Sequence, residues 1–273
     1  MSALLETEIY ELVDARHGRF LANPHDAYIG KSIITYGEFS EGEWQLFANI
    51  LQPGMVVIEA GANMGAHTVP LAKHLGLSGL VYAFEPQLAI FQQLCANLAL
   101  NDLLNVVAFN AGAGETSDWM SIVRPHPARD NNFGGFSLEK LAVEAPYIRI
   151  RIERLDEAVD PPRLDLLKAD VEGMEVEVLK GAAGLIQQYR PLLYLEANFD
   201  DAPALIQHVF DLDYEAWWHI PPLYDPNNFN GVTQDIFGNI TSKNILCAPR
   251  ERKRKIEGGR AVTGPDDHPR NWG

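Results

Sequence analysis

The sequence predicts an α/β domain built on a doubly wound, mostly parallel sheet. Five short runs are almost continuously apolar, as in strands that are buried on both faces. They alternate with segments whose apolar residues recur every three or four positions, the pattern of amphipathic helices. A loop with two glycines follows the first run and an acidic residue ends the second, an arrangement typical of ligand sites in such sheets.

Composition limits the protein class. The 273 residues are 47% hydrophobic and 22% charged, which excludes collagen-like, coiled-coil and wholly disordered chains. No apolar run approaches the roughly 20 residues that a membrane helix needs. The first residues carry acids where a secretory signal has basic and apolar segments. We therefore expect a soluble, cytoplasmic protein with no membrane partner.

Three regions are predicted along the chain. Residues 1–51 form an N-terminal extension, with a β-hairpin within 7–22 and two helical pieces within 27–51. Ser40 and Glu43 have capping-box spacing at the start of the second piece. Residues 52–249 form the main domain.

The third region, residues 250–273, lacks apolar periodicity and predicts a disordered tail. Basic residues outnumber acidic ones in it, whereas the chain as a whole has a net charge of −15. An acidic body argues against nucleic acid as the main partner. The basic cluster of the tail could contact RNA or an anionic surface, although a solvated tail is the alternative.

The elements of the main domain follow in order. The five core strands are expected at 55–60, 80–85, 105–110, 164–170 and 191–196. Strands at 214–219 and 244–248 complete a seven-stranded sheet, and the less regular residues 111–163 contain strands near 117–123 and 147–152. Cys95 and Cys247 are expected to be buried free thiols rather than a disulfide.

The loop after the first core strand is the strongest candidate site. Gly61 and Gly65 let the chain turn sharply and let backbone N–H groups approach a ligand. Glu85 ends the second strand, where doubly wound folds place the carboxylate that binds ribose hydroxyls. Asn63 occupies the position where a dinucleotide site needs glycine. The loop therefore favours S-adenosylmethionine, which has no pyrophosphate, over a nicotinamide dinucleotide.

Several motifs resemble the FkbM family of S-adenosylmethionine-dependent methyltransferases. They are Gly61-x-Asn63-x-Gly65-x-His67-Thr68, Phe84-Glu85-Pro86, Lys168-x-Asp170-Val171-Glu172-Gly173-x-Glu175, Val178-Leu179-Lys180-Gly181 and late segments such as Asn244-Ile245-Leu246-Cys247-x-Pro249. The resemblance covers residues 15–251. It implies a class I methyltransferase fold and, as in many members, O-methylation of sugar or polyketide hydroxyls.

The resemblance also implies a set of cofactor-binding residues. They are Glu59, Gly61, Asn63, Gly65, His67, Thr68, Glu85, Pro86, Asn110 and Ala111. The glycine loop is expected to line the methionine and ribose part, Glu85 to hold the ribose, and residues 110–113 to flank the adenine.

Catalysis of methyl transfer to a hydroxyl requires alignment and removal of the hydroxyl proton. Asp170 ends the fourth strand and is the first candidate for the base, with Glu172 second. Glu175 is interpreted as structural or solvated. His219 and Asn198 are candidate contacts to the methyl acceptor, and the loops 131–135 and 221–231 are either site loops or surface connections.

Asp170, Glu196 and Asn198 would also offer three oxygen ligands suited to Mg²⁺, which could lower the pKa of the acceptor oxygen. The alternative is that these groups hydrogen-bond the acceptor or one another without metal.

The favoured function is S-adenosylmethionine-dependent O-methylation of a small or glycosylated molecule. The alternatives are a nicotinamide-dependent oxidoreductase and a catalytically silent cofactor-fold protein that acts by interaction. Fold does not fix the acceptor.

Overall fold

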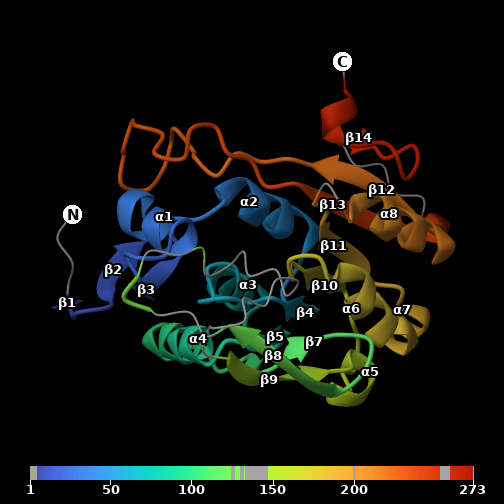
Figure 1. Cartoon of the computed structure of the whole chain (residues 1–273), viewed down its shortest axis with the longest axis horizontal. Coiled ribbons are helices and arrows are strands. Elements are labelled where there is room, and N and C mark those ends of the chain that lie inside the picture. Colours follow the sequence, from blue (N-terminus) through green and yellow to red (C-terminus); the bar gives the residue numbers. More distant parts are fainter. Residues whose placement is uncertain are drawn as a thin grey trace.

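The computed structural model describes residues 5–123, 127–129, 132, 147–198, 201–252 and 259–272. A central sheet has helices on both faces, and the N-terminal extension lies beside it (Figure 1). This arrangement confirms the predicted α/β class, a class I methyltransferase-type sheet. Within the described ranges no helix is both long and apolar enough to cross a bilayer.

The main sheet has eight strands in the order β14-β12-β13-β11-β10-β4-β5-β6. Their bounds are β4 Val56–Ala60, β5 Leu80–Phe84, β6 Val106–Phe109, β10 Leu166–Ala169, β11 Leu192–Glu196, β12 Tyr214–His219, β13 Asn244–Pro249 and β14 Arg260–Ala261. The five central strands are parallel, and β13 runs antiparallel between β11 and β12. The seven predicted strands are confirmed, and β14 is an addition.

The helices are short and follow the strands. They are α1 Ile29–Tyr36, α2 Glu41–Ile50, α3 Thr68–Leu75, α4 Leu88–Leu100, α5 Leu155–Ala158, α6 Glu175–Gly181, α7 Ala183–Tyr189 and α8 Ala202–Asp211, with 3₁₀ turns at Arg250–Arg252 and Pro269–Asn271. The carboxyl end of β4 leads into α3 and that of β5 into α4. Ligand sites in such sheets form at these carboxyl ends.

The N-terminal extension is fixed to the main domain by side-chain hydrogen bonds. Its strands are β1 Leu5–Glu6, β2 Glu11–Ala15 and β3 Gly18–Ala22, which confirms the predicted hairpin. The Leu21 N–H donates to Asn97 Oδ1 at 2.7 Å, and Gln93 Nε2 donates to the Leu21 carbonyl at 2.7 Å. This polar face of α4 is buried, so Cys95 is exposed and the prediction of its burial is wrong.

The capping box predicted at α2 is also wrong. Ser40 has a left-handed backbone with φ of 44°, and its side chain makes no hydrogen bond to the helix backbone. Instead Ser40 Oγ donates to Glu43 Oε1 at 2.8 Å. The two side chains of the predicted box are therefore bonded to each other.

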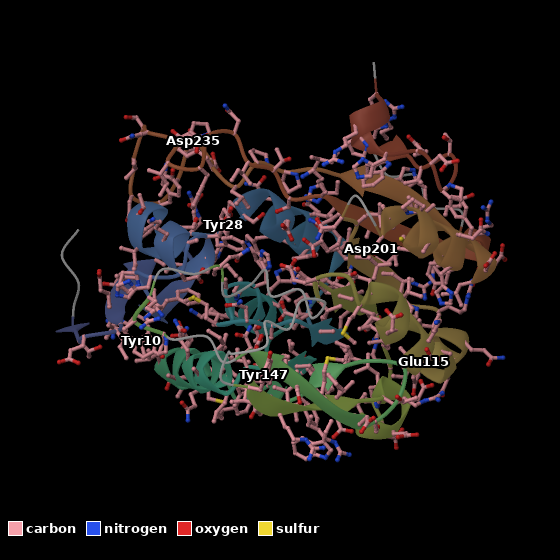
Figure 2. The ribbon with its side chains drawn as sticks, viewed as in Figure 1. Tyr10, Tyr28, Glu115, Tyr147, Asp201 and Asp235 are labelled. Atoms are coloured by element: carbon pink, nitrogen blue, oxygen red, sulfur yellow. The ribbon has the colours of Figure 1, made fainter. Side chains whose placement is uncertain are left out.

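The loop between β12 and β13 packs across the extension. Ile236 donates its N–H to the Tyr36 hydroxyl at 2.8 Å, and Phe237 stacks near Tyr28 with ring centroids 5.9 Å apart. Figure 2 shows Asp235 of this loop above α1 and Tyr28 turned toward the middle of the molecule. The extension and this loop together form one side of the molecule.

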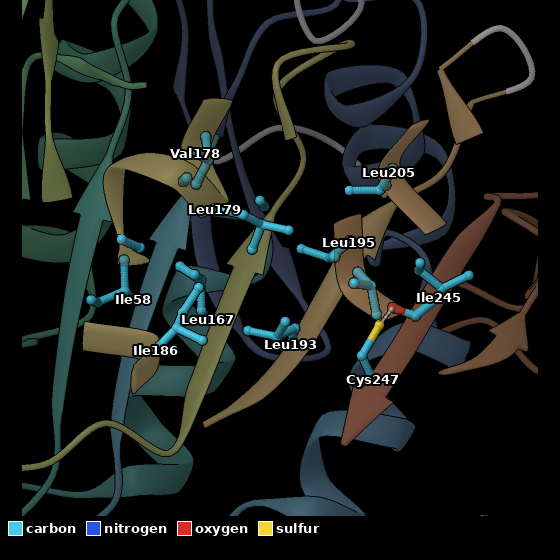
Figure 3. Close-up of a cluster of buried hydrophobic side chains, with 14 of the residues drawn as sticks. Ile58, Leu167, Val178, Leu179, Ile186, Leu193, Leu195, Leu205, Ile245 and Cys247 are labelled. Carbon is cyan, nitrogen blue, oxygen red and sulfur yellow. Dashed lines mark hydrogen bonds between the residues drawn. The ribbon is translucent and has the colours of Figure 1, made fainter. Parts of the chain in front are cut away.

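Alternating strand residues fill the core on the two faces of the sheet. Leu193, Leu195 and Cys247 pack with α6 and α8, as Figure 3 shows, whereas Tyr194 and Leu246 pack with α2 and α3. This alternation follows from the pleat of each strand. Because of this alternation, every second residue of β10 and β11 lies on the same face of the sheet as the candidate site.

A second, three-stranded sheet lies next to the carboxyl ends of β5 and β6. Its strands are β7 Gly112–Ala113, β8 Asp118–Val123 and β9 Tyr147–Glu153, in the order β7-β9-β8. Ile122, Ile150 and Ile152 form its buried face. The loop 131–135 lies outside the described residues except for Asn132.

The C-terminal segment is folded over residues 259–272, so the prediction of a disordered tail is wrong there. Strand β14 pairs with Trp217 and Trp218 of β12, and the Trp272 ring lies 6.1 Å from that of Trp218. The Arg260 guanidinium stacks 4.0 Å from the Trp272 ring centroid. These aromatic contacts have no sequence period, so the pattern did not reveal them. Residues 253–258 and 273 lie outside the described residues.

Gly61 leaves no room for a side chain. Its φ is +84°, and a Cβ would clash with the carbonyl oxygen of Asp170. Gly231 has a similar φ of +66° but open space around it. We expect Gly231→Ala to lower the free energy of unfolding by about 1–2 kcal/mol, the cost of the backbone conformation alone. Gly61→Ala should cost about 1–3 kcal/mol more, because overpacking adds to that cost.

Urea unfolding at pH 7 measures both values. Equal losses of unfolding free energy in the two variants would contradict the close approach of the glycine loop to the end of β10.

Candidate active site

A cavity of about 400 Å³ opens at the carboxyl ends of the central strands. The predicted residues that line it are Glu59, Gly61, Asn63, His67, Glu85, Pro86, Asp170, Glu172, Glu196 and Asn198. The structure thus brings together most of the candidate site. Five candidates stand behind its wall: Gly65, Thr68, Asn110, Ala111 and His219.

The residues behind the wall have supporting contacts. Thr68 Oγ1 donates to Glu59 Oε2 at 2.6 Å, and Asn110 Nδ2 donates to the Glu85 carbonyl at 3.0 Å. Ala111 is part of the hydrophobic core. His219 Nδ1 lies 2.8 Å from the hydroxyl of buried Tyr194. These residues are not in the lining of the cavity, and their contact with a ligand stays a prediction.

Glu85 joins the glycine loop after β4 to the loop after β5 at the edge of the cavity. It is 3% exposed, and its carboxylate accepts the N–H of Asn63 at 3.1 Å and that of Gln87 at 2.8 Å. Burial raises the pKa of Glu85 to about 7, although both N–H groups favour its ionised form. The side chain of Asn63 folds back onto its own loop, where Oδ1 accepts the Met64 N–H at 2.6 Å.

Lys168 lies under the cavity and was not predicted as a site residue. It stands beside Glu59 of β4 and Tyr194 of β11 in the parallel register. Its Nζ is 3.6 Å from Glu59 Oε1 and 3.4 Å from Asp170 Oδ2, and the side chain is 2% exposed. The only sign of Lys168 in the sequence was a polar residue inside an apolar run. The groups that such a residue pairs with come from neighbouring strands, which the run itself does not identify.

The charges around Lys168 compensate one another. Burial acts to lower the pKa of Lys168, but the Asp170, Glu59 and Glu43 carboxylates outweigh it and the net shift is upward. Burial raises the pKa of Glu59, and Lys168 and the Thr68 hydroxyl oppose that shift. Lys168 is thus the cation that balances the acidic groups at the centre of the sheet.

Three acidic groups converge at the end of β10. Ligand oxygens of Asp170, Glu172 and Glu196 lie within 4.8 Å of one another. Burial, with Asp170 and Glu175 next, raises the pKa of Glu172 to about 8. Burial, with Asp170 and Glu172 next, raises the pKa of Glu196 well above its usual value. Both shifts favour the protonated forms of Glu172 and Glu196.

All three predicted magnesium ligands line the cavity. Asp170 and Glu196 are in the acidic group, and the side chain of Asn198 hydrogen-bonds to that of Glu196. Glu172 joins the group because its left-handed backbone, with φ of 56°, turns it toward Asp170. Magnesium at this place stays a prediction.

Glu175 is structural, as expected. Its carboxylate is 4% exposed and accepts the N–H of Val171 at 2.9 Å and that of Gly173 at 3.1 Å. It therefore closes the turn that presents Asp170 and Glu172.

An apolar wall borders the cavity near Glu85. Ile122, Ile150 and Ile152 of the small sheet line it, together with Pro86 and Gly112. The predicted flank at 110–113 is thus present through Gly112 and Ala113. The isoleucines were not predicted, because an alternating pattern identifies a strand but not what its buried face meets.

The opposite side of the cavity comes from the extension and the β12–β13 loop. Tyr28, Ile29 and Phe39 line it from the extension, and Leu223 and Ile240 line it from the loop. Asn228 of this loop is used within the fold, as its Nδ2 donates to the carbonyls of Asp225 and Val232. This side of the cavity combines apolar residues with polar ones, which are Glu43, Thr241, Ser242, Lys243 and Asn244.

The buried pair of Lys168 and Glu59 gives a test of this geometry. Lys168→Met should lower the free energy of unfolding by about 3–5 kcal/mol, because Glu59 is left buried without its cation. The double variant Glu59→Gln/Lys168→Met should recover part of the loss, since it removes the buried Glu59 charge that Lys168 balances. Denaturant unfolding at pH 7 measures both, and a double variant as unstable as Lys168→Met would contradict the pairing.

Comparison with known proteins places the chain in a family. A family model described as the methyltransferase FkbM domain matches residues 59–216. Methyltransferase 1 of Beauveria bassiana is 26% identical over 153 residues, which are 46% of this chain and 57% of that protein. Methyltransferase sdnD of Sordaria araneosa is 26% identical over 163 residues, 46% of this chain and 59% of that protein.

The chain thus spans less than two thirds of the length of these two relatives. A crystal structure of the methyltransferase FkbM from Methylobacillus flagellatus KT is 16% identical, with a TM-score of 0.46 over 74% of this chain and 50% of that one. The family match takes in both the glycine loop and the acidic strand ends that form the cavity. The chain belongs to the FkbM methyltransferase family.

Proposed function

We propose that this chain is an S-adenosylmethionine-dependent methyltransferase that acts on a hydroxyl oxygen of a small molecule. One observation carries the proposal. A single cavity has the buried Glu85 carboxylate near one end and the half-exposed Asp170 carboxylate at the other. The glycine loop lies between them, on the strand that the sheet order places between β5 and β10.

The residues fit the cofactor. Glu85 offers carboxylate oxygens to ribose hydroxyls, and Ile122, Ile150 and Ile152 offer an apolar face to adenine. The absence of a Cβ at Gly61 lets the loop pass against β10. When bound, S-adenosylmethionine supplies a sulfonium methyl with a good leaving group. The protein must then mainly align the acceptor and exclude water.

Asp170 is the proposed base for the acceptor hydroxyl. Its side chain is 41% exposed, and Lys168 Nζ lies 3.4 Å from one of its oxygens. Burial, with Asp170 and Glu175 next, raises the pKa of Glu172 to about 8, so Glu172 holds its proton at neutral pH. This difference supports Asp170 over Glu172 as the proposed base.

The apolar side chains that the extension and the β12–β13 loop contribute to the cavity support a small organic acceptor. Tyr28, Phe39 and Leu223 would pack against its carbon skeleton, while Asp170 would meet the hydroxyl. The names of the two relatives specify methyltransferases without an acceptor.

Cofactor binding gives the first test. We expect S-adenosylhomocysteine to bind in a calorimetric titration and Glu85→Ala to weaken it about ten- to a hundredfold, the loss of a charged hydrogen bond to ribose. Glu115→Ala, at an exposed acid outside the cavity, is the matched control and should bind as the wild type does. NAD should give no heat. Binding of NAD in preference to S-adenosylhomocysteine would support the oxidoreductase alternative.

The pKa of Glu85 predicts how this binding depends on pH. Burial is the main cause of the value of about 7, so Glu85 is mostly protonated at pH 6 and mostly ionised at pH 8. Ribose hydroxyls donate more strongly to the ionised form. The affinity for S-adenosylhomocysteine should therefore rise about tenfold from pH 6 to pH 8. Glu85→Gln should abolish this rise, and an unchanged slope in that variant would assign it to another group.

A further inference from the structure

We infer that a groove between α2, α3 and the β2–β3 turn binds a small oxyanion of the phosphate type, with Lys73 and Trp44 as its hydrogen-bond donors. This groove shares no lining residue with the cavity of the proposed function. The inference therefore does not depend on that function.

The groove is lined by basic side chains. The β2–β3 turn contributes Arg16 and His17, α2 contributes Trp44, and α3 contributes Lys73 and His74. Among the described residues that line the groove, every ionisable side chain is basic, although the chain as a whole has a net charge of −15. A hollow with charges of one sign attracts small ions of the opposite sign. The ligand that fits is therefore an anion.

Lys73 has no anionic partner in the part of the chain that the structure describes. Its Nζ donates to two neutral acceptors, the His17 carbonyl and, at 2.8 Å, Asn101 Oδ1. Burial lowers the pKa of Lys73, and no described carboxylate opposes this shift. An ammonium group has three donors, so one of them is left for a ligand.

The ammonium of Lys73 is held against the backbone of the turn. Gly18 has a φ of +144°, and a Cβ at this position would lie 2.4 Å from Lys73 Nζ. The absence of a side chain at Gly18 lets the ammonium pack there, where its two hydrogen bonds fix it. A donor that is already ordered loses less conformational entropy when a ligand binds.

Trp44 offers the second donor. Its ring lies near those of His17 and His74, with centroids 5.2 and 5.6 Å away. These contacts hold the indole at the wall of the groove, and its N–H makes no hydrogen bond with any described residue. Because an indole nitrogen can only donate, an oxyanion satisfies this N–H and the free donor of Lys73 at the same time.

The other basic groups limit the size of the anion. Arg16 Nε lies 2.7 Å from Glu38 Oε2, and His17 Nε2 lies 2.8 Å from Glu41 Oε2. These carboxylates balance part of the positive charge, so the charge without a partner is centred on Lys73. One phosphate-sized ion fits this distribution, whereas a polyanion such as nucleic acid would need a row of free cations.

Titrations with phosphates test the inference. Inorganic phosphate and phenyl phosphate are titrated calorimetrically into the full chain at pH 7.5 and low ionic strength, because salt screens exposed charges. Lys73→Met removes the ammonium but keeps the length of the side chain, and Lys73→Arg restores a cation. Lys31→Met makes the same change of charge at an exposed lysine of α1 outside the groove, and is the matched control. A thermal melt checks that each variant is folded.

We expect saturable binding of phosphate to the wild type and an affinity at least tenfold lower in Lys73→Met. Lys73→Arg and Lys31→Met should stay close to the wild type. Trp44→Phe keeps an aromatic ring but lacks the N–H, and should weaken phosphate about three- to tenfold. Tighter binding of phenyl phosphate would identify the ligand as a phosphate ester whose ring packs on Trp44, and equal affinities would identify it as the free ion.

Three results would overturn the inference. They are no saturable binding to the wild type, an unchanged affinity in Lys73→Met, and an equal loss in Lys31→Met, which indicates a general effect of net charge. Excess S-adenosylhomocysteine should leave the affinity for phosphate unchanged. Competition between the two ligands would place the anion in the main cavity and would also contradict a separate site.

Discussion

A buried lysine ammonium between two carboxylates holds the centre of the sheet and the centre of the site together. Lys168 connects Glu59 of β4 with Asp170 at the end of β10. Glu59 in turn receives the Thr68 hydroxyl from the start of α3. The strand that carries the glycine loop, the helix after it and the proposed base are thus parts of one charge-compensated network. Loss of the Lys168 ammonium leaves the buried Glu59 carboxylate without its cation.

The elements that position the cavity were predictable from the sequence because burial on both faces leaves an apolar run. The ends of such runs identified Gly61, Glu85 and Asp170. Lys168 was missed because a single polar residue in a run acquires meaning only from neighbouring strands. The wall made by Ile122 and Ile150 was missed for a related reason, since a two-residue period reports burial but not the partner.

Sequence patterns within a single helix or turn gave the least reliable predictions of side-chain contacts. Ser40 and Glu43 have the spacing of a capping box, yet Ser40 takes a left-handed conformation and the two side chains bond to each other. Gln93 and Asn97 give one face of α4 a polar sequence, which predicts exposure, yet this face is buried against β3. In both places tertiary hydrogen bonds decide what a helix pattern alone leaves open. The same holds for Asn110, which supports Glu85 through its carbonyl.

The short strand β14 has a consequence for the behaviour of the protein in solution. An uncovered strand edge offers unpaired N–H and C=O groups to other molecules and is a template for aggregation. By pairing with Trp217 and Trp218, β14 occupies the part of β12 where that edge is most aromatic. By covering this part of the edge, the C-terminal segment hinders edge-to-edge association. This effect depends on its backbone pairing rather than on its basic side chains.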